Sequence, residues 1–394
     1  MEQVLYKLPD GWEWSNLTDV CTPSRKTVEP NPEEQYNYIG LENIESHTGK
    51  VISNSPTKGS EISSTKVSFK KGMVLYGKLR PYLNKVVVAK IDGIATTEII
   101  PFECSDVISP DFLAYYLRSQ YFVDLAMNNC SGARMPRATT KLFTQIAKVP
   151  VTSITEQKRI VEKLDALLTR IDTAIEHLQE SVTLADALVK SSLSAMLTKQ
   201  EHWDKVSLSD VCQITSKLCD PREEQYLDMF HIGGANIASF NGELIGLKTA
   251  REEKLISGKF PFDNSMVLYS KIRPYLMKVA RPSFSGICSA DIYPLTPDNQ
   301  KMSRDFLFYL LLSDLFTQYA IEGSSRAGMP KVNRNHLFNF EFYLPPIDEQ
   351  KSICESLDAL VEKTNEVSKE LTGKLSYLAG LKASILDSAF KGEL

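Results

Sequence analysis

The stretch that decides the fold occurs twice in this chain. Residues 72–86 read GMVLYGKLRPYLNKV, and residues 265–279 read SMVLYSKIRPYLMKV. Gly72 and Ser265 open the two copies and lie 193 residues apart. This spacing far exceeds the ~20–50 residues of a solenoid repeat, so each copy is predicted to be a domain with an appendage of its own.

The match extends outward from these segments over the whole chain. The further pairs are LTDVC (17–21) with LSDVC (208–212), DGIATTEIIP (92–101) with SGICSADIYP (285–294), SPDFLAYYL (109–117) with SRDFLFYLL (303–311), RMPR (134–137) with GMPK (328–331), and TEQKRIVEKLDAL (155–167) with DEQKSICESLDAL (348–360). The sequence therefore predicts an internal duplication.

The composition is that of an ordinary folded protein. With 394 residues, 43% hydrophobic and 24% charged, the chain is too long for one core, and no apolar run approaches the roughly 18 residues of a membrane helix. The N-terminus, MEQVLYKLPDGWEW, lacks the features of a secretory signal, so a cytoplasmic location is expected. The seven cysteines are odd in number and scattered, which predicts reduced and mostly buried thiols.

Each copy changes character at a proline-marked boundary, near Pro150 in the first copy and Pro345 in the second. Before it, short β-branched and aromatic runs broken by Gly, Pro, Asn and Ser favour strands and loops, with helical segments between them. After it, apolar residues recur at the 3-4 spacing of a coiled coil. The predicted fold class is α+β: two mixed α/β domains in internal duplication, separated by two long antiparallel coiled-coil helices.

The two long helices are predicted to start near Thr155 and Asp348. Pairing them antiparallel would separate the two domains along a rod of ~60–70 Å. The predicted seam positions are Val161, Leu164, Leu168, Ile171, Ile175, Leu178, Val182, Ala185 and Val189 in the first helix, and Cys354, Leu357, Val361, Thr364, Ser368, Leu371, Leu375 and Leu378 in the second.

The formal net charge of −4 hides two basic regions. Residues 66–90 hold seven basic residues and no acidic one, and residues 259–281 hold five against one aspartate. Basic side chains interleaved with tyrosines suit phosphate contact and base-edge readout, whereas the alternative is a solvated strand-turn-strand in which Arg-Pro marks the turn. Together with the RMPR and GMPK segments, the predicted DNA-binding residues are Lys78, Arg80, Tyr82, Lys85, Arg134, Arg137, Lys271, Arg273, Tyr275, Lys278, Arg326, Lys331 and Arg334.

Two asparagines are further candidates for base contact. Asn43 lies in GLENI (40–44) and Asn236 in GANI (234–237), and an asparagine side chain can pair with an adenine edge. The alternative is that each asparagine fixes its own turn. The loop SGARMPRATTK (131–141) is equally open to a DNA-contacting or a structural interpretation.

No motif for catalysis is present in the sequence. The only Pro-Pro, Pro345-Pro346, lies at a helix entrance and lacks the context of an adenine methyltransferase motif, and there is no phosphate-binding G-x-x-x-x-G-K-[ST] loop. No nuclease spacing of carboxylates or cluster of metal-binding residues is visible, and His231 and His336 are interpreted as ordinary loop residues. The chain is therefore predicted to be non-catalytic, with no metal and no cofactor of its own.

With these features in place, the chain resembles the specificity subunits of type I restriction-modification systems. The resemblance rests on YIGLENI (38–44), on the repeated K-[LI]-R-P-Y-L-x-K segment and on proline followed by E-Q-K at the head of a long helix, and it covers essentially the whole chain. It implies target-recognition domains at 1–151 and 200–346 and conserved helical regions at 152–199 and 347–394. Individual base-reading residues do not transfer, because such domains vary with the target sequence.

The resemblance also implies a function and a set of partners. The chain would recognise a bipartite site in double-stranded DNA and direct two methylation subunits and the restriction subunits, with S-adenosylmethionine, ATP and Mg bound by those partners. Apolar residues crowd the C-terminal ends of the two helices and are predicted to bind the partner, contact with the opposite globular domain being the alternative. They are Leu184, Leu188, Leu193, Met196, Leu197, Leu381, Ile385, Leu386 and Phe390.

Three other functions are compatible with parts of the pattern. A stand-alone DNA-binding or antirestriction protein would share the architecture without the partners. A methyltransferase or nuclease with an unrecognised site would show activity by itself. A purely structural coiled-coil spacer would leave the duplicated basic regions without a role.

Overall fold

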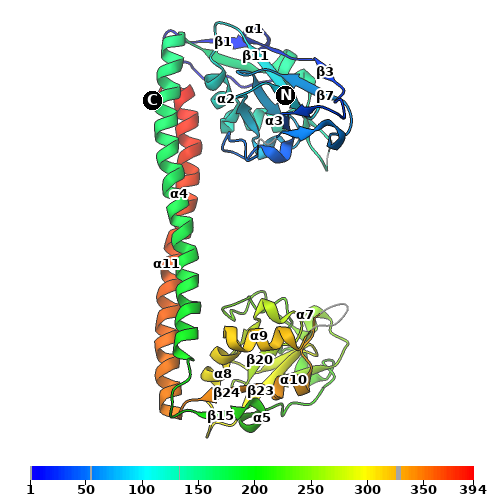
Figure 1. The fold of residues 1–394 in the computed structure, drawn as a ribbon, viewed down its shortest axis with the longest axis vertical. Coiled ribbons are helices and arrows are strands. Elements are labelled where there is room, and N and C mark those ends of the chain that lie inside the picture. Colours follow the sequence, from blue (N-terminus) through cyan, green and yellow to red (C-terminus); the bar gives the residue numbers. More distant parts are fainter. Residues whose placement is uncertain (1, 54–55, 133, 325–329) are drawn as a thin grey trace. The chain divides into compact units, whose positions relative to one another are not determined.

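The computed structural model describes residues 2–53, 56–132, 134–324 and 330–394, which form two compact units (Figure 1). Unit 1 comprises residues 1–179 and 372–394, and unit 2 comprises residues 180–371. Each unit contains one mixed α/β domain and a part of each of two long helices, α4 (Ile154–Met196) and α11 (Ile347–Phe390). The predicted combination of two mixed domains and two long helices is confirmed.

The domain of unit 1 is built on two four-stranded sheets. One has the order β3-β7-β10-β5, in which only β5 and β10 pair in parallel, and the other the order β2-β11-β8-β9, antiparallel throughout. Two-stranded pairs join β1 to β14, β4 to β6 and β12 to β13. The strands are β1 (Glu13–Asn16), β2 (Cys21–Pro23), β3 (Thr27–Val28), β4 (Gln35–Tyr36), β5 (Tyr38–Ile39), β6 (Thr57–Lys58), β7 (Lys66–Phe69), β8 (Val74–Gly77), β9 (Val86–Val88), β10 (Gly93–Ala95), β11 (Ile99–Cys104), β12 (Cys130–Ser131), β13 (Arg137–Ala138) and β14 (Lys148–Val151).

The domain of unit 2 repeats this plan, as the duplication predicts. Its sheets have the orders β18-β17-β22-β19 and β16-β23-β20-β21, again with one parallel pair, β17 with β22. The strands are β15 (Asp204–Ser207), β16 (Cys212–Gln213), β17 (Phe230–Ile232), β18 (Lys248–Thr249), β19 (Lys259–Phe262), β20 (Val267–Ser270), β21 (Val279–Ala280), β22 (Gly286–Ser289), β23 (Ile292–Pro297) and β24 (Glu341–Leu344), which pairs with β15.

Short helices connect and cover these sheets. In unit 1 they are α1 (Leu17–Val20), η1 (Leu41–Asn43), η2 (Gly59–Glu61), η3 (Pro81–Leu83), α2 (Pro110–Arg118), α3 (Gln120–Asn128) and the π-helical turn η4 (Leu142–Ile146). In unit 2 they are α5 (Leu208–Val211), α6 (Glu224–Leu227), α7 (Ala250–Glu253), η5 (Pro274–Leu276), α8 (Arg304–Leu311), α9 (Asp314–Glu322) and α10 (Arg334–Phe338). Helices α2 and α8 begin where the hydroxyls of Ser109 and Ser303 accept the N–H groups of Phe112 and Phe306.

The long helices are part of the domain cores. Ile160 and Leu164 of α4 and Phe390 of α11 are buried in the core of unit 1, and Leu193 of α4 and Leu357 of α11 in that of unit 2. Burying each of these side chains stabilises the fold by about 1.5–3 kcal/mol, so each domain holds its helical segments firmly.

A buried glutamine fixes the start of each long helix. The Gln157 amide accepts the N–H of Ser109 at 2.8 Å and donates to the carbonyls of Val107 and Thr152 at 2.9 and 2.8 Å. Gln350 makes the equivalent bonds to Ser303, Lys301 and Pro345. The glutamine of each E-Q-K segment therefore has a structural role, because its side chain is fully buried and both of its polar atoms are hydrogen-bonded.

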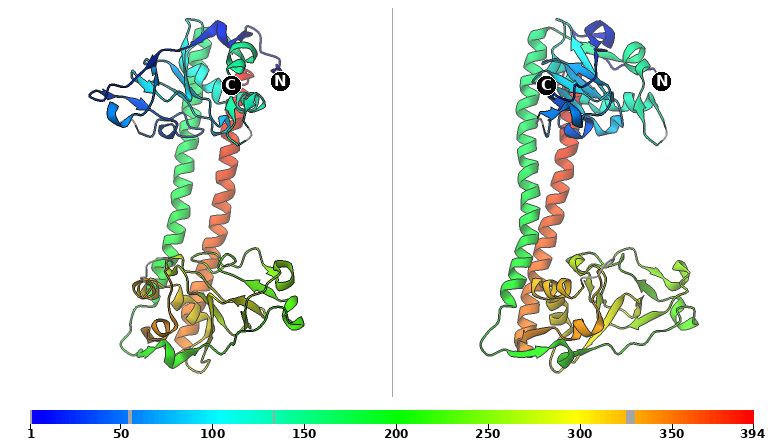
Figure 2. Two further views of the ribbon diagram at one scale, coloured as in Figure 1. Left: turned by 90° about the vertical axis from the view of Figure 1, so that its right-hand side faces the viewer. Right: turned by 45° about the vertical axis from the view of Figure 1, so that its right-hand side comes forward.

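Within unit 1 the two helices run antiparallel. Arg159 donates to the Leu394 carbonyl at 2.9 Å, just beyond the end of α11, and further along α4 Asp172 pairs with Lys382. Residue numbers therefore increase along α4 in the direction in which they decrease along α11 (Figure 2). Every predicted seam position of both helices is buried or half-buried, as a coiled coil requires.

All seven cysteines are free thiols, and burial raises the pKa of Cys21, Cys212, Cys288 and Cys354 far above the ordinary value.

His231 lies in strand β17 and His336 in helix α10, so the prediction that both are loop residues is wrong. Among the described residues, no helix combines the length and apolar character needed to cross a membrane.

Candidate nucleic-acid interface

The repeated K-[LI]-R-P-Y-L segment forms the same unusual turn in both units. Arg80 and Asn84 have φ of 52° and 50°, and Arg273 and Met277 have φ of 51° and 48°, all in the left-handed region. Each turn encloses a short 3-10 helix that begins at the proline. Non-glycine residues in this region cost roughly 1–2 kcal/mol each, so the surrounding structure must hold the turn in place.

Backbone hydrogen bonds hold this turn against two other segments. In unit 1 the N–H of Arg80 donates to the Pro136 carbonyl at 2.7 Å, and the N–H of Lys78 to the Glu98 carbonyl at 2.9 Å. In unit 2, Arg273 donates to Pro330 at 2.9 Å and Lys271 to Asp291 at 3.0 Å. In each unit the fold therefore brings three segments together: the turn, the acidic residue before β11 or β23, and the segment containing Met-Pro. In the sequence these three segments appear only as separate motifs.

The side chains at the centre of the turn face solvent. Tyr82 and Tyr275 are 44% and 49% exposed, and Arg80 and Arg273 are exposed as well. Neither arginine side chain makes a hydrogen bond or ion pair within the described part of the chain. An exposed guanidinium beside an exposed aromatic ring on a rigid turn suits contact with phosphates and bases.

A carboxylate lies among the basic side chains around each turn. We call these side chains the basic cluster of the unit: Arg80 and Arg137 in unit 1, and Lys271, Arg273 and Lys331 in unit 2. Glu98 pairs with Arg137, its Oε1 lying 3.1 Å from Nη2. Asp291 occupies the equivalent place and lies 3.3 Å from Lys331 Nζ and 3.6 Å from Lys271 Nζ. Neither acid was predicted from the sequence, although both recur at matching places in TTEII (96–100) and SADIY (289–293).

Lys85 and Lys278 are engaged inside their domains. The Lys85 ammonium donates to the Leu41 carbonyl at 2.6 Å, and that of Lys278 to the Gly234 carbonyl. Both lysines are half-buried, and each bond fastens the turn to the preceding GLEN or GGAN segment. This placement argues against the predicted DNA contact by these two residues.

Two more lysines of the basic runs are also structural. Lys66 and Lys259 are each 5% exposed, and their ammonium groups donate to the carbonyls of Ser64 and Ser257 at 2.8 Å. Burial lowers the pKa of both lysines. The basic runs of the sequence therefore overstate the charge that reaches the surface.

Both candidate asparagines fix their own turns. The Asn43 side-chain oxygen accepts the N–H of Gly40 at 2.7 Å, and that of Asn236 accepts the N–H of Gly233 at 2.9 Å. Asn236 also donates to the carbonyl of Ile245 at 3.0 Å. Both residues therefore have the turn-fixing role that the sequence left open as the alternative, since each side-chain oxygen accepts a backbone N–H of its own segment.

The remaining basic candidates lie in different surroundings. Arg134 is exposed in the segment before β13, and Arg137 is exposed at its ion pair with Glu98. Arg334 opens α10 and lies over the Phe338 ring at 5.7 Å. Arg326 lies outside the described residues.

The predicted partner surface divides into exposed and buried positions. Leu184 and Leu188 of α4 are 61% and 52% exposed. Leu193 is buried in the core of unit 2 with Met196 and Leu197 packed against it, Leu386 and Phe390 are buried in the core of unit 1 with Ile385 packed against it, and Leu381 is half-buried. The buried positions make the contact with a globular domain that was the alternative prediction, whereas Leu184 and Leu188 are exposed and open to a partner.

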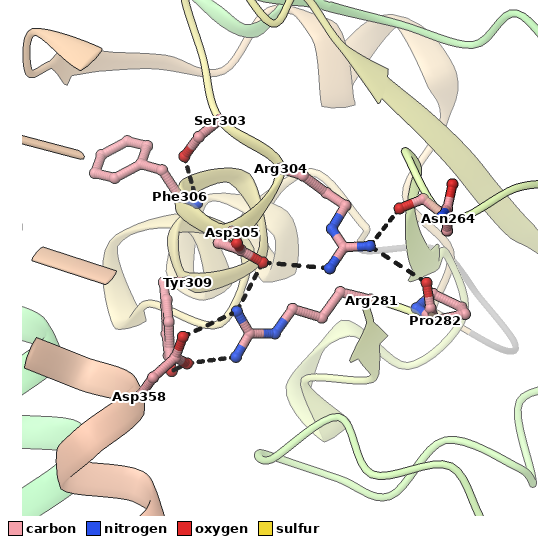
Figure 3. Close-up of polar contacts among 9 residues, drawn as sticks. All are labelled: Asn264, Arg281, Pro282, Ser303, Arg304, Asp305, Phe306, Tyr309 and Asp358. Atoms are coloured by element: carbon pink, nitrogen blue, oxygen red, sulfur yellow. Dashed lines mark hydrogen bonds and ion pairs between the residues drawn. The ribbon is translucent and has the colours of Figure 1, made fainter. Parts of the chain in front are cut away.

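Arg281, counted among the basic residues of the second copy, is half-buried and engaged in ion pairs. Figure 3 shows its guanidinium between Asp305 of α8 and Asp358 of α11, where it lies 2.7 Å from Asp305 and also contacts Asp358. The Tyr309 hydroxyl donates to the same Asp358 carboxylate. This cluster fastens the domain of unit 2 to α11. In unit 1 the equivalent pair, Tyr115 and Asp165, is bonded as well.

Comparison with known proteins identifies the family. The model of the type I restriction modification DNA specificity domain matches residues 9–184 and 200–377, which together make up most of the chain. The chain belongs to this family and contains two copies of its domain. The expectation of a type I restriction-modification specificity subunit is thereby confirmed.

Individual relatives agree with the family model. The type I restriction enzyme EcoDI specificity subunit of Escherichia coli is 29% identical over 322 residues, 73% of this chain and 71% of the relative. The StySPI specificity subunit of Salmonella potsdam is 24% identical over 432 aligned positions, 98% of this chain and 90% of the relative.

Two solved structures share the fold. A chain from a study of complex assembly and conformational transition of the type I R-M system has a TM-score of 0.81 at 22% identity, covering 99% of this chain and 100% of that one. The HsdS subunit from Thermoanaerobacter tengcongensis has a TM-score of 0.57 at 23% identity, covering 99% of each chain.

Proposed function

We propose that this chain reads a bipartite site in double-stranded DNA, one half-site per domain, and directs the methylation and restriction subunits of a type I system to it. The observation that carries the proposal is the recurrence, in two domains of one family, of an exposed Arg-Pro-Tyr turn braced by the same backbone hydrogen bonds. The two domains differ in sequence around this common turn, which suits the reading of two different half-sites.

The chain is proposed to act without chemistry of its own. Two methylation subunits and the restriction subunits would bind it, and S-adenosylmethionine, ATP and Mg would be held by those partners. Exposed Leu184 and Leu188 on α4 support a docking role for the helices, because large apolar side chains in water favour association. A chain with this role would work in the cytoplasm, where the DNA is.

Methylation mapping tests the proposal. Genomes of a host strain with the intact gene and of its deletion mutant are compared for modified bases. We expect a split motif of two short half-sites, methylated in the intact strain and lost in the mutant. An unchanged methylome in a strain that expresses the gene and its neighbouring methyltransferase would overturn the proposal and favour a DNA-binding protein that acts alone.

A further inference from the structure

Each basic cluster contains one carboxylate at the same structural position. Glu98 precedes β11 and Asp291 precedes β23, and the backbone carbonyl of each accepts the N–H of the lysine that opens the Arg-Pro-Tyr turn. The Met-Pro segment lies on the other side of that lysine, since Ala138 donates to the Lys78 carbonyl at 2.9 Å and Val332 to the Lys271 carbonyl at 2.8 Å. The fold thus fixes an acid among bases in both domains.

The ion pairs are not needed to hold these segments together. The backbone hydrogen bonds already join them, and an exposed ion pair adds little to folding stability. Glu98 and Arg137 retain 26% and 47% of their side-chain exposure, and Asp291 and Lys331 retain 49% and 46%. The effect that remains is electrostatic, because the two carboxylates change how strongly the surface attracts charged DNA.

The effect on DNA differs between random and target sequences. Random DNA is held almost entirely through phosphate contacts, so a fixed negative charge among the bases weakens that binding. At the target site, bonds to base edges add to the affinity and require side chains held in one orientation. A carboxylate that orients Arg137 or Lys331 therefore lowers random binding more than target binding.

We propose that Glu98 and Asp291 are specificity-determining residues that compete with DNA phosphates for the basic side chains of their own clusters. This inference rests on the proposed function, because it concerns the same DNA-contacting surface. It treats both acids as positioning residues and not as base readers. A base reader would be expected to differ between two domains that read different half-sites, whereas this carboxylate recurs on the same backbone frame.

The test measures binding of the full chain, together with the subunits that co-purify with it, to a fluorescent duplex of random sequence at several salt concentrations. Glu98→Gln and Asp291→Asn are each expected to raise the affinity for random duplex roughly two- to fivefold at low salt. Each is also expected to steepen the slope of log affinity against log salt concentration by up to about one, which corresponds to the release of one more counterion. The control is Glu103→Gln, an exposed acid near the other end of β11 with the same charge change.

A double variant shows whether Glu98 acts through Arg137. Adding Arg137→Gln to Glu98→Gln is expected to abolish the gain in affinity, because the released guanidinium is then absent. Thermal melting of each variant checks folding, and we expect little change because the backbone hydrogen bonds that join these segments remain in every variant.

Each other outcome contradicts the inference. An equal gain with Glu103→Gln would reduce the effect to net charge. A changed methylated half-site with unchanged random binding would make the acid a base reader. A wild-type complex that binds no duplex would overturn the proposed function itself, and this is seen before any variant is compared.

Discussion

The backbone N–H of Arg80 donates to the Pro136 carbonyl at 2.7 Å, and this bond joins a strained turn to a segment 56 positions further along the chain. Arg273 and Pro330 repeat it at 2.9 Å in unit 2. Because the bond uses the backbone of the arginine, the side chain remains free to reach outward. A rigid backbone with an exposed guanidinium is the arrangement expected of a residue that meets DNA.

The first prediction separates base reading from phosphate contact at this arginine. If Arg80 reads a base, Arg80→Ala should cost about 1–3 kcal/mol of binding at one half-site, and Arg80→Lys should lose nearly as much, because lysine lacks the bidentate fork. Binding of duplexes altered in one half-site at a time measures this, with Arg273→Ala and Arg273→Lys as the matched pair for the other half. If Arg80→Lys keeps the wild-type affinity while Arg80→Ala weakens all duplexes equally and flattens the salt slope by about one, the contact is to phosphate.

The second prediction concerns the glutamine at the head of α4. Gln157→Leu removes the three hydrogen bonds of a buried amide, to the N–H of Ser109 and the carbonyls of Val107 and Thr152, in a part-buried place. We expect a loss of about 3 kcal/mol in the free energy of unfolding, or roughly 6–12 °C in the melting temperature of unit 1. Calorimetry measures both. Lys158→Leu, at the next and exposed position, is the control and should leave melting unchanged; equal melting of the two variants would show that the glutamine bonds do not stabilise the helix start.

The sequence predicted the duplication, the mixed domains and the helix seams because these depend on local pattern and period. It did not separate Arg80 from Lys85, since both look like basic residues of one run. What distinguishes them is a hydrogen bond from Lys85 to Leu41, 44 positions away, and only the folded sheet brings these groups together. For the same reason the sequence could not show that Arg281 is engaged inside unit 2, because its partner Asp358 is 77 positions away on α11.

The third prediction tests the exposed leucines of α4 as a docking surface. Leu184→Glu and Leu188→Glu are expected to reduce co-purification of the methylation subunits without lowering the melting temperature, because both side chains are exposed. Leu193→Ala should behave differently and cost about 2–5 kcal/mol of stability, since that side chain fills the core of unit 2. Undiminished co-purification of the double variant Leu184→Glu, Leu188→Glu would exclude this face.

The last prediction is a pH dependence of unit 2 that originates at His231. The imidazole is 8% exposed, its Nδ1 lies 2.8 Å from a Glu253 carboxylate oxygen, and its Nε2 is buried without a hydrogen-bond partner in the described part of the chain. Burial lowers the pKa of His231 below its ordinary value of 6.5, an effect that the nearby Glu253 opposes only in part.

The folded state therefore holds this histidine neutral, whereas the unfolded chain takes up a proton as the pH falls through about 6.5. Because the unfolded state then binds more protons, the stability of unit 2 is fully present above that pH and decreases below it. Denaturant unfolding between pH 8 and 5.5 measures the slope. His231→Asn is expected to be less stable at pH 8, because it leaves a small cavity, but to lose less stability on acidification. If His231→Asn keeps the wild-type slope, the acid sensitivity of unit 2 has another origin.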